Sequence, residues 1–236
     1  MEESMMLDAR PEPIAIIPSN TAVIVVDMQN DFGSTGGMFD RAGIDISGIQ
    51  RAISPTARAV AGGRALGMKI IYLKMGYRPD LSDLGSFDAR NRLIHERFGV
   101  GETVTSPDGR VGRVLIRHTW GTDIVKELAP QDEDIVMYKT RFSGFYGTDL
   151  DSVLKAAGIT TLIVTGCTTS VCVESTIRDA FFRDYRCVLL TDCTSEPVGH
   201  GMSRSNHDAS LLLIEIMFGW LSTSEQFLKS SVAMSA

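Results

Sequence analysis

The sequence predicts a three-layer α/β fold, in which a doubly wound, mostly parallel sheet has helices on both faces. Two observations lead to this fold class. The apolar runs of the chain are continuous rather than alternating, which is typical of strands covered on both faces. Helical patterns alternate with these runs along the chain, as they do in parallel βαβ units.

Five short runs rich in apolar and β-branched residues are predicted to be the strands. They span residues 22–26, 69–73, 134–138, 161–164 and 187–190. Helices are predicted between them at 49–66, 123–128, 149–157 and 172–184, and a last helix at 207–218. Gly67, Pro130 and Gly158 follow the first three of these helices and are typical of helix ends.

The segment from Gly76 to Trp120 interrupts this alternation. It combines charged helical turns with a glycine-rich stretch at 99–112. A long irregular segment within an α/β chain commonly carries function. We therefore expect residues 76–120 to be an insertion that covers the site as a lid, within a single domain spanning residues 1–236.

Composition excludes several classes of partner. With 236 residues, 44% of them hydrophobic, the chain can bury a full core. Its net charge of −6 argues against nucleic acid, whose binding needs a dense basic face. No apolar run is long enough to span a membrane, and the first 20 residues lack a signal-peptide pattern. The four cysteines form no Cys-x-x-Cys pair, so a cytoplasmic protein with reduced thiols is expected.

Three reactive side chains directly follow predicted strands. Asp27 follows the first, Lys139 the third, and Cys172 the turn after the fourth. Ligands of open α/β sheets bind beyond the carboxyl ends of the strands, so these three groups should converge. A carboxylate can take the proton of a thiol, an ammonium group can stabilise anions, and a thiolate can attack a carbonyl. The start of a helix should also favour the thiolate.

Each of these residues alone has an ordinary structural explanation. An aspartate after a strand usually caps a turn, a lysine usually lies at the surface, and a cysteine is often a small core residue. The sequence around the three residues favours the functional interpretation.

Three motifs in chain order carry a resemblance to a known family. They are Asp27-Met28-Gln29-Asn30-Asp31-Phe32, Lys139-Thr140-Arg141-Phe142-Ser143-Gly144-Phe145, and the stretch 166–180 around Cys172. Together they resemble the isochorismatase-like cysteine hydrolase superfamily over about residues 21–227. The middle and last motifs are most similar to ureidoacrylate amidohydrolases, whereas residues 76–84 are similar to biuret hydrolases.

The resemblance implies a role for each residue of the site. Cys172 would be the nucleophile, Asp27 the general base and acid, and Lys139 the third member of the triad. A cis peptide bond is implied between Cys167 and Thr168. The backbone N–H groups of Thr168 and Cys172 would then form an oxyanion hole.

Three further residues are predicted to bind substrate. Asn30 is expected to offer a polar contact and Phe32 an apolar wall. Arg141, two residues past Lys139, can aim its guanidinium at a carboxylate or a urea-type oxygen. An arginine that fixes the loop through backbone carbonyls is the alternative for that position.

No metal and no cofactor are expected. Some nicotinamidase relatives hold a metal through aspartate and closely spaced histidines. The four histidines of this chain, at positions 95, 118, 200 and 207, form no such pair.

The function expected from the resemblance is hydrolysis of the C–N bond of a small ureido or carbamoyl amide through an acyl-cysteine. Ureidoacrylate is the first candidate substrate, and biuret or triuret follow. An isochorismatase, a nicotinamidase-like hydrolase and a non-catalytic binding module of the same fold are the alternatives. Relatives are commonly dimers or tetramers, so a homo-oligomer is expected.

Overall fold

The computed structural model describes residues 4–197 and 205–232, and its centre is one six-stranded parallel sheet. The strands lie in the order β10-β9-β8-β3-β4-β7. Their bounds are Thr21–Val26 for β3, Lys69–Met75 for β4, Ile135–Lys139 for β7, Thr161–Cys167 for β8, Arg186–Ser195 for β9 and Trp220–Ser222 for β10. Every residue of β3 and β8 is buried, as the continuous apolar runs predict.

The strand order places a topological switch point between β3 and β8. From β3 the chain moves outward through β4 and β7, then returns to pair β8 with the other side of β3, at Val26↔Gly166. Gly166 has φ 114°, and a Cβ atom there would lie 2.0 Å from the carbonyl oxygen of Val26. The two strands therefore approach closely where their carboxyl ends separate, which is where open α/β sheets bind ligands.

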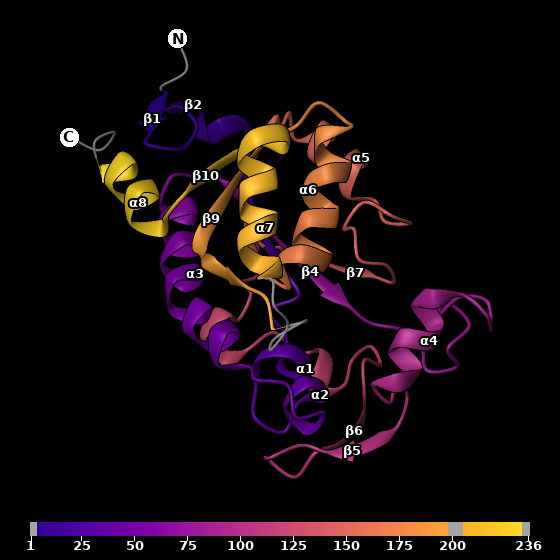
Figure 1. The fold of residues 1–236 in the computed structure, drawn as a ribbon. Coiled ribbons are helices and arrows are strands. Elements are labelled where there is room, and N and C mark those ends of the chain that lie inside the picture. The colour runs from indigo at the N-terminus through magenta and orange to yellow at the C-terminus, as the bar shows by residue number, and fades with distance from the viewer. Residues whose placement is uncertain (1–3, 198–204, 233–236) are drawn as a thin grey trace.

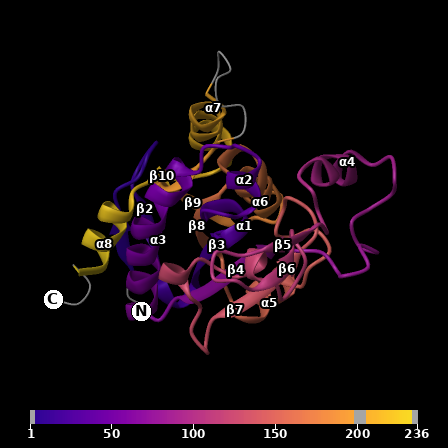
Figure 2. The same ribbon diagram turned by 90° about the horizontal axis from the view of Figure 1, so that it is seen from below.

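Helices cover both faces of the sheet (Figures 1 and 2). On one face, α3 (Ser47–Ala65) packs against α8 (Ser224–Val232). On the other face lie α5 (Leu150–Ala156), α6 (Glu174–Phe181) and α7 (Asn206–Leu213), the last extended by a π-helical turn at Ile214–Phe218. A hairpin of β1 (Met5–Leu7) and β2 (Ile14–Ile16) packs beside α8, and a 3₁₀ turn at Pro18–Asn20 leads into β3. The predicted three-layer α/β fold class is confirmed.

The insertion forms small elements of its own. These are α4 (Arg90–Arg97) and an antiparallel hairpin of β5 (Thr103–Thr105) and β6 (Val111–Arg113). Together with α1 (Asn30–Gly33) and α2 (Met38–Arg41) they lie at the lower end of the molecule in Figure 1, and α4 stands to one side in Figure 2. The buried Asp31 joins insertion and body, because its carboxylate accepts hydrogen bonds from the N–H groups of Leu115, at 2.9 Å, and Met38, at 3.2 Å.

Two predicted elements differ in the structure, and one strand of the sheet was not predicted. The helix predicted at 123–128 is wrong: two 3₁₀ turns, Trp120–Thr122 and Lys126–Leu128, flank an extended stretch there. That stretch is extended because Ile124 forms an antiparallel β-bridge with Gln29, and the N–H of Val125 donates a hydrogen bond to the carbonyl of Met28. The helix predicted at 172–184 begins earlier, with a π-helical turn at Thr169–Val173. The strand β10 was not predicted.

No helix in the described part of the chain is long and apolar enough to cross a membrane.

Candidate active site

The three reactive side chains predicted from the sequence meet at the carboxyl edge of the sheet. Lys139 Nζ lies 2.7 Å from Asp27 Oδ2, and both side chains are fully buried. The Cys172 thiol is buried and interacts with both groups. The three come from the ends of β3 and β7 and from the turn after β8, so the parallel sheet brings together residues far apart in the chain.

Asp27 is held in one orientation by the backbone of β4. It adopts φ 51°, a left-handed conformation that aspartate tolerates better than most residues. Its N–H donates to the carbonyl of Leu73 at 2.8 Å, and its Oδ1 accepts from the N–H of Met75 at 2.9 Å. Within the part of the chain that the structure describes, Oδ2 pairs with Lys139 and accepts no hydrogen bond of good geometry. This oxygen therefore keeps acceptor capacity for a proton.

Lys139 carries its positive charge in a buried setting. Burial acts to lower the pKa of its ammonium group, but the interactions with Asp27 and then with Cys172 outweigh burial and raise the pKa above its usual value. The ammonium also donates to the carbonyl of Arg141 at 3.2 Å. Lys139 is thus a permanent cation beside the carboxylate and the thiol.

Cys172 lies in the π-helical turn Thr169–Val173, which leads into α6. The carbonyl of Thr168 accepts the N–H groups of Val171, at 3.1 Å, and Val173, at 3.2 Å, which fixes the turn. Burial and then the charge of Asp27 raise the pKa of the Cys172 thiol, while Lys139 opposes them. In the resting site, burial and the neighbouring carboxylate thus act against the thiolate that the start of the helix was expected to favour.

A cavity of about 200 Å³ opens onto this cluster. It is mostly apolar. Its lining comprises Asp27, Phe32, Met38, Phe39, Met75, Ile94, His95, Phe98, Phe142, Cys167, Thr168, Val171 and Cys172. The predicted cis peptide bond between Cys167 and Thr168 is present, and both residues border the cavity.

The three predicted substrate contacts fare differently. Phe32 lines the cavity. Asn30 does not, because its side chain donates to the carbonyl of Trp120 at 2.8 Å and accepts from Ser34 Oγ at 2.7 Å. Arg141 does not line it either. Its Nη1 donates to the carbonyls of Thr140, at 2.6 Å, and Asp83, at 3.2 Å, as the loop-fixing alternative describes.

His95 is a polar lining residue that the sequence did not reveal. It lies on α4, among Arg90, Arg92 and Arg97, and is nonetheless buried. A helix this charged has no apolar stripe to mark which residue faces inward. Only the folded insertion brings His95 to the cavity.

No metal-binding cluster is evident in residues 4–197 and 205–232, where no three His, Cys, Asp or Glu side chains gather in a suitable group. His200 lies outside the described residues.

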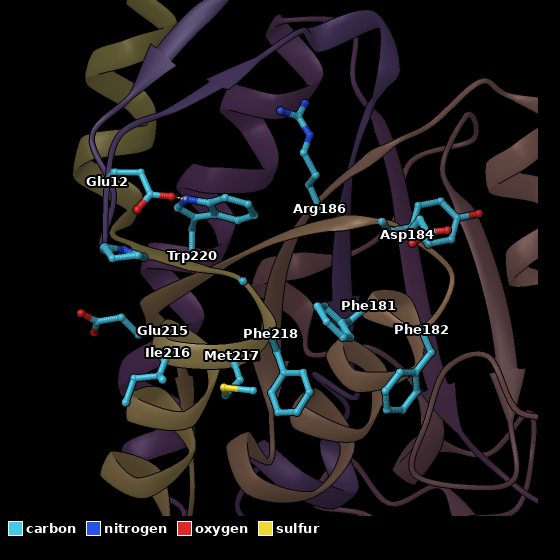
Figure 3. A pocket seen from close by; sticks show the side chains of 13 residues that line it. Glu12, Phe181, Phe182, Asp184, Arg186, Glu215, Ile216, Met217, Phe218 and Trp220 are labelled. Carbon is cyan, nitrogen blue, oxygen red and sulfur yellow. Dashed lines mark hydrogen bonds between the residues drawn. The ribbon is translucent and has the colours of Figure 1, made fainter.

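A second hollow of about 570 Å³ lies elsewhere, between α6, the turn after α7 and the N-terminal segment (Figure 3). It is a wide groove bordered by Phe181, Phe182, Ile216 and Phe218, and Trp220 Nε1 donates to Glu12 Oε1 at its rim. Glu215 also borders it and pairs with Arg10. None of the three reactive residues borders this groove.

Comparison with known proteins identifies the family. The Isochorismatase domain family matches residues 21–226. The chain belongs to the isochorismatase family. The resemblance carried by the three motifs is therefore confirmed.

The family's curated members include close relatives of this chain. This chain is 41% identical to "Ureidoacrylate amidohydrolase RutB" of Variovorax paradoxus strain S110. The match extends over 225 residues, which are 95% of this chain and 86% of the relative. A protein of the same name from Methylobacterium radiotolerans is 43% identical over 92% of this chain and 82% of its own length. Among solved structures, a cysteine hydrolase from Pseudomonas syringae pv. phaseolicola superposes with a TM-score of 0.78 at 31% identity, covering 93% of this chain and 95% of the other.

Proposed function

We propose that this protein is a cysteine-dependent amidohydrolase that cleaves the C–N bond of a small ureido or carbamoyl amide. The observation that carries the proposal is the buried contact of Asp27, Lys139 and Cys172 beside a mostly apolar cavity. The relatives named ureidoacrylate amidohydrolase support the same class of reaction.

In the first half of the reaction, a carbon–sulfur bond forms. Asp27 Oδ2 takes the proton of the Cys172 thiol as the sulfur attacks the substrate carbonyl, because the free thiol has a raised pKa and needs a base at the moment of attack. The carbonyl electrons move to the oxygen. The N–H groups of Thr168 and Cys172 hold that oxyanion, and the charge of Lys139 stabilises it.

In the second half, the tetrahedral intermediate collapses and the C–N bond breaks. Protonated Asp27 gives its proton to the leaving nitrogen, and a thiocarbamate or thioester remains on Cys172. Water then attacks this carbonyl while Asp27 takes one of its protons. The C–S bond breaks as Asp27 returns that proton to the sulfur, which restores the thiol. Apart from water, all groups in these steps belong to the chain or the substrate.

Ureidoacrylate is the substrate we propose first, with biuret and triuret next. A cavity of about 200 Å³ admits a compound of that size but not a large one. The phenylalanines at 32, 39, 98 and 142 line the cavity and also suit a flat aromatic amide, which makes nicotinamide the substrate of the second candidate function.

The insertion and the assembly complete the proposal. We infer that residues 76–120 act as a lid within one domain, since Ile94, His95 and Phe98 wall the cavity from the side of α4. We also infer a cytoplasmic homo-oligomer, a dimer or tetramer. A gel-filtration mass equal to that of one 25.7 kDa chain would contradict this assembly.

A substrate panel tests the function. Loss of each compound should be followed for ureidoacrylate, biuret, triuret, nicotinamide and N-carbamoyl amino acids, with the Cys172→Ala variant as the matched control. We expect turnover of a ureido compound by the wild-type protein and, after rapid quenching, a mass adduct on the peptide that contains Cys172. Turnover without any adduct, or equal activity in Cys172→Ala, would refute the cysteine mechanism. A wild-type protein that is inert to the panel and to iodoacetamide would favour a binding module.

A further inference from the structure

His95 introduces a polar side chain into the cavity from the insertion. The other polar side chains of the lining, Asp27, Thr168 and the two cysteines, come from the carboxyl edge of the sheet. The mechanism above uses that edge and leaves His95 without a role. A buried imidazole in a mostly apolar cavity is costly unless its nitrogens find partners.

The hydrogen bonds of His95 fix its tautomer. Nδ1 lies 2.6 Å from the carbonyl oxygen of Asn91, one turn earlier in α4. A carbonyl oxygen can only accept, so Nδ1 carries the hydrogen. In the neutral ring, Nε2 is then an acceptor with a free lone pair.

The hydroxyl group of Tyr77 competes for that lone pair, but it has a second acceptor within reach. The hydroxyl oxygen of Tyr77 lies 3.4 Å from Nε2 and 3.3 Å from Nδ1 of the imidazole, and 3.3 Å from the carbonyl oxygen of Thr140. Since Nδ1 carries a hydrogen, Nε2 and the Thr140 carbonyl are the two acceptors for this hydroxyl. The hydroxyl has one hydrogen and can serve only one of these acceptors. When Tyr77 donates to Thr140, Nε2 is left for a ligand.

The surroundings keep the imidazole neutral. Burial lowers the pKa of His95, and the positive charges of Lys139 and Arg141 lower it further, while the hydrogen bond to Asn91 opposes them. Phe142 and the phenolic ring of Tyr77 pack against the imidazole. A neutral ring accepts a hydrogen bond from an N–H group and does not bind a carboxylate as a cation would.

We propose that His95 Nε2 accepts a hydrogen bond from the terminal NH₂ of the ureido group, which stays on the scissile carbonyl while the substituted nitrogen leaves, and thereby selects ureido compounds over simple amides. The proposal rests on the proposed function and adds a specificity-determining residue to it. An amide with CH₃ in place of this NH₂ leaves Nε2 unpaired in an apolar cavity. Sites built around such a hydrogen bond discriminate strongly against an analogue that lacks it.

The test compares two substrates in four proteins. The substrates are ureidoacrylate and the N-acetyl amide in which CH₃ replaces its terminal NH₂, so that the same C–N bond breaks in both, and kcat/KM for the loss of each gives a preference ratio. In His95→Leu we expect the ratio to fall about tenfold, because kcat/KM should fall for the ureido compound and stay unchanged for the other substrate. In His95→Gln, whose amide oxygen is an acceptor, part of the preference should return.

Tyr77→Phe is the matched control, because it removes a contact of the imidazole without changing the lining of the cavity. Its ratio should equal or exceed that of the wild-type protein, because the variant removes the hydroxyl that competes for Nε2. His95→Phe keeps an aromatic ring and replaces His95→Leu if that variant does not fold.

Two results would refute the hydrogen bond assigned to His95, and a third would also refute the proposed function. An unchanged ratio in an active apolar variant refutes the hydrogen bond. An equal loss on both substrates in the apolar and Gln variants assigns His95 a structural role only. A wild-type protein that hydrolyses neither of these compounds, nor biuret nor triuret, refutes the proposed function and, with it, this inference.

Discussion

Two hollows of the molecule, the cavity at the sheet edge and the groove beside α6 and α7, differ in the way that separates a reaction site from a surface feature. The groove beside α6 and α7 has the larger volume, about 570 Å³ against about 200 Å³ for the cavity at the sheet edge. Its walls are open to water, with Phe182 67% and Ile216 65% exposed. The cavity is bordered instead by a cluster of charges from which water is excluded. Size therefore says less about chemistry than the burial of charge does.

The ion pairs of the two regions make the same point. Lys139 and Asp27 meet at 2.7 Å with both side chains buried, whereas Arg10 and Glu215 at the groove are 3.4 Å apart with Arg10 largely exposed. A charge interaction is much stronger where water is absent, and an unpaired charge there is much more costly. Near the cavity, a strong electrostatic interaction is confined to the buried pair of Lys139 and Asp27. At the groove, the exposed pair of Arg10 and Glu215 interacts weakly.

The largest contrast between the regions should come from their cysteines. Cys172→Ala should reduce kcat by roughly 10⁴-fold or more, because it removes the atom that attacks. Cys187→Ala removes a buried thiol from β9, whose backbone lies against Gly219 of the groove, and should leave kcat unchanged. Steady-state kinetics, with circular dichroism to check the fold, measures both. Comparable losses in the two variants would mean that stability rather than chemistry was being measured.

The residues that the sequence located are those whose position follows from topology alone. Parallel strands have their carboxyl ends at one edge, so Asp27 and Lys139 had to share it once their strands were recognised. Cys172 follows a third strand and shares this edge for the same reason. Their convergence needed no knowledge of loops.

The features that the sequence did not locate depend on contacts outside that pattern. His95 reaches the cavity because the insertion folds back, which no periodicity encodes. The three-residue strand β10 is too short to give a period, and the segment at 123–128 looks helical yet runs extended against Gln29 and Met28. Arg141 has the spacing of a substrate contact, but nearby carbonyls occupy its guanidinium.

Removing one partner from each ion pair gives the next contrast. Lys139→Met leaves the buried carboxylate of Asp27 unpaired and should cost about 3–5 kcal/mol of unfolding free energy, together with activity. Arg10→Met should change the unfolding free energy by less than about 1 kcal/mol, because its pair is exposed. Urea denaturation followed by fluorescence compares them, and similar midpoints would contradict the contrast.

The same pair predicts a pH dependence. Although burial acts against it, the pKa of Lys139 is raised in the folded protein by Asp27 and Cys172. Its contribution to stability is thus complete below the ordinary lysine value of about 10.4 and declines as the pH rises through the folded value. The difference in unfolding free energy between the wild-type protein and Lys139→Met should stay constant just below the ordinary lysine pKa. It should become smaller as the pH rises through the folded pKa of Lys139.

The smallest expected effect lies in the groove itself. Ile216→Ser places a polar group where the side chain is already mostly in water, so kcat/KM should stay at the wild-type value and stability should change by less than about 0.5 kcal/mol. Phe218→Ser tests more strictly whether the two hollows are independent. The guanidinium of Arg178 lies over the Phe218 ring at 4.4 Å, and Arg178 also pairs with Glu174, two residues after Cys172. If the regions are independent, both variants keep full activity. A loss of kcat confined to Phe218→Ser would show that the groove reaches the nucleophile through α6, and the separation of the two hollows would fail at that helix.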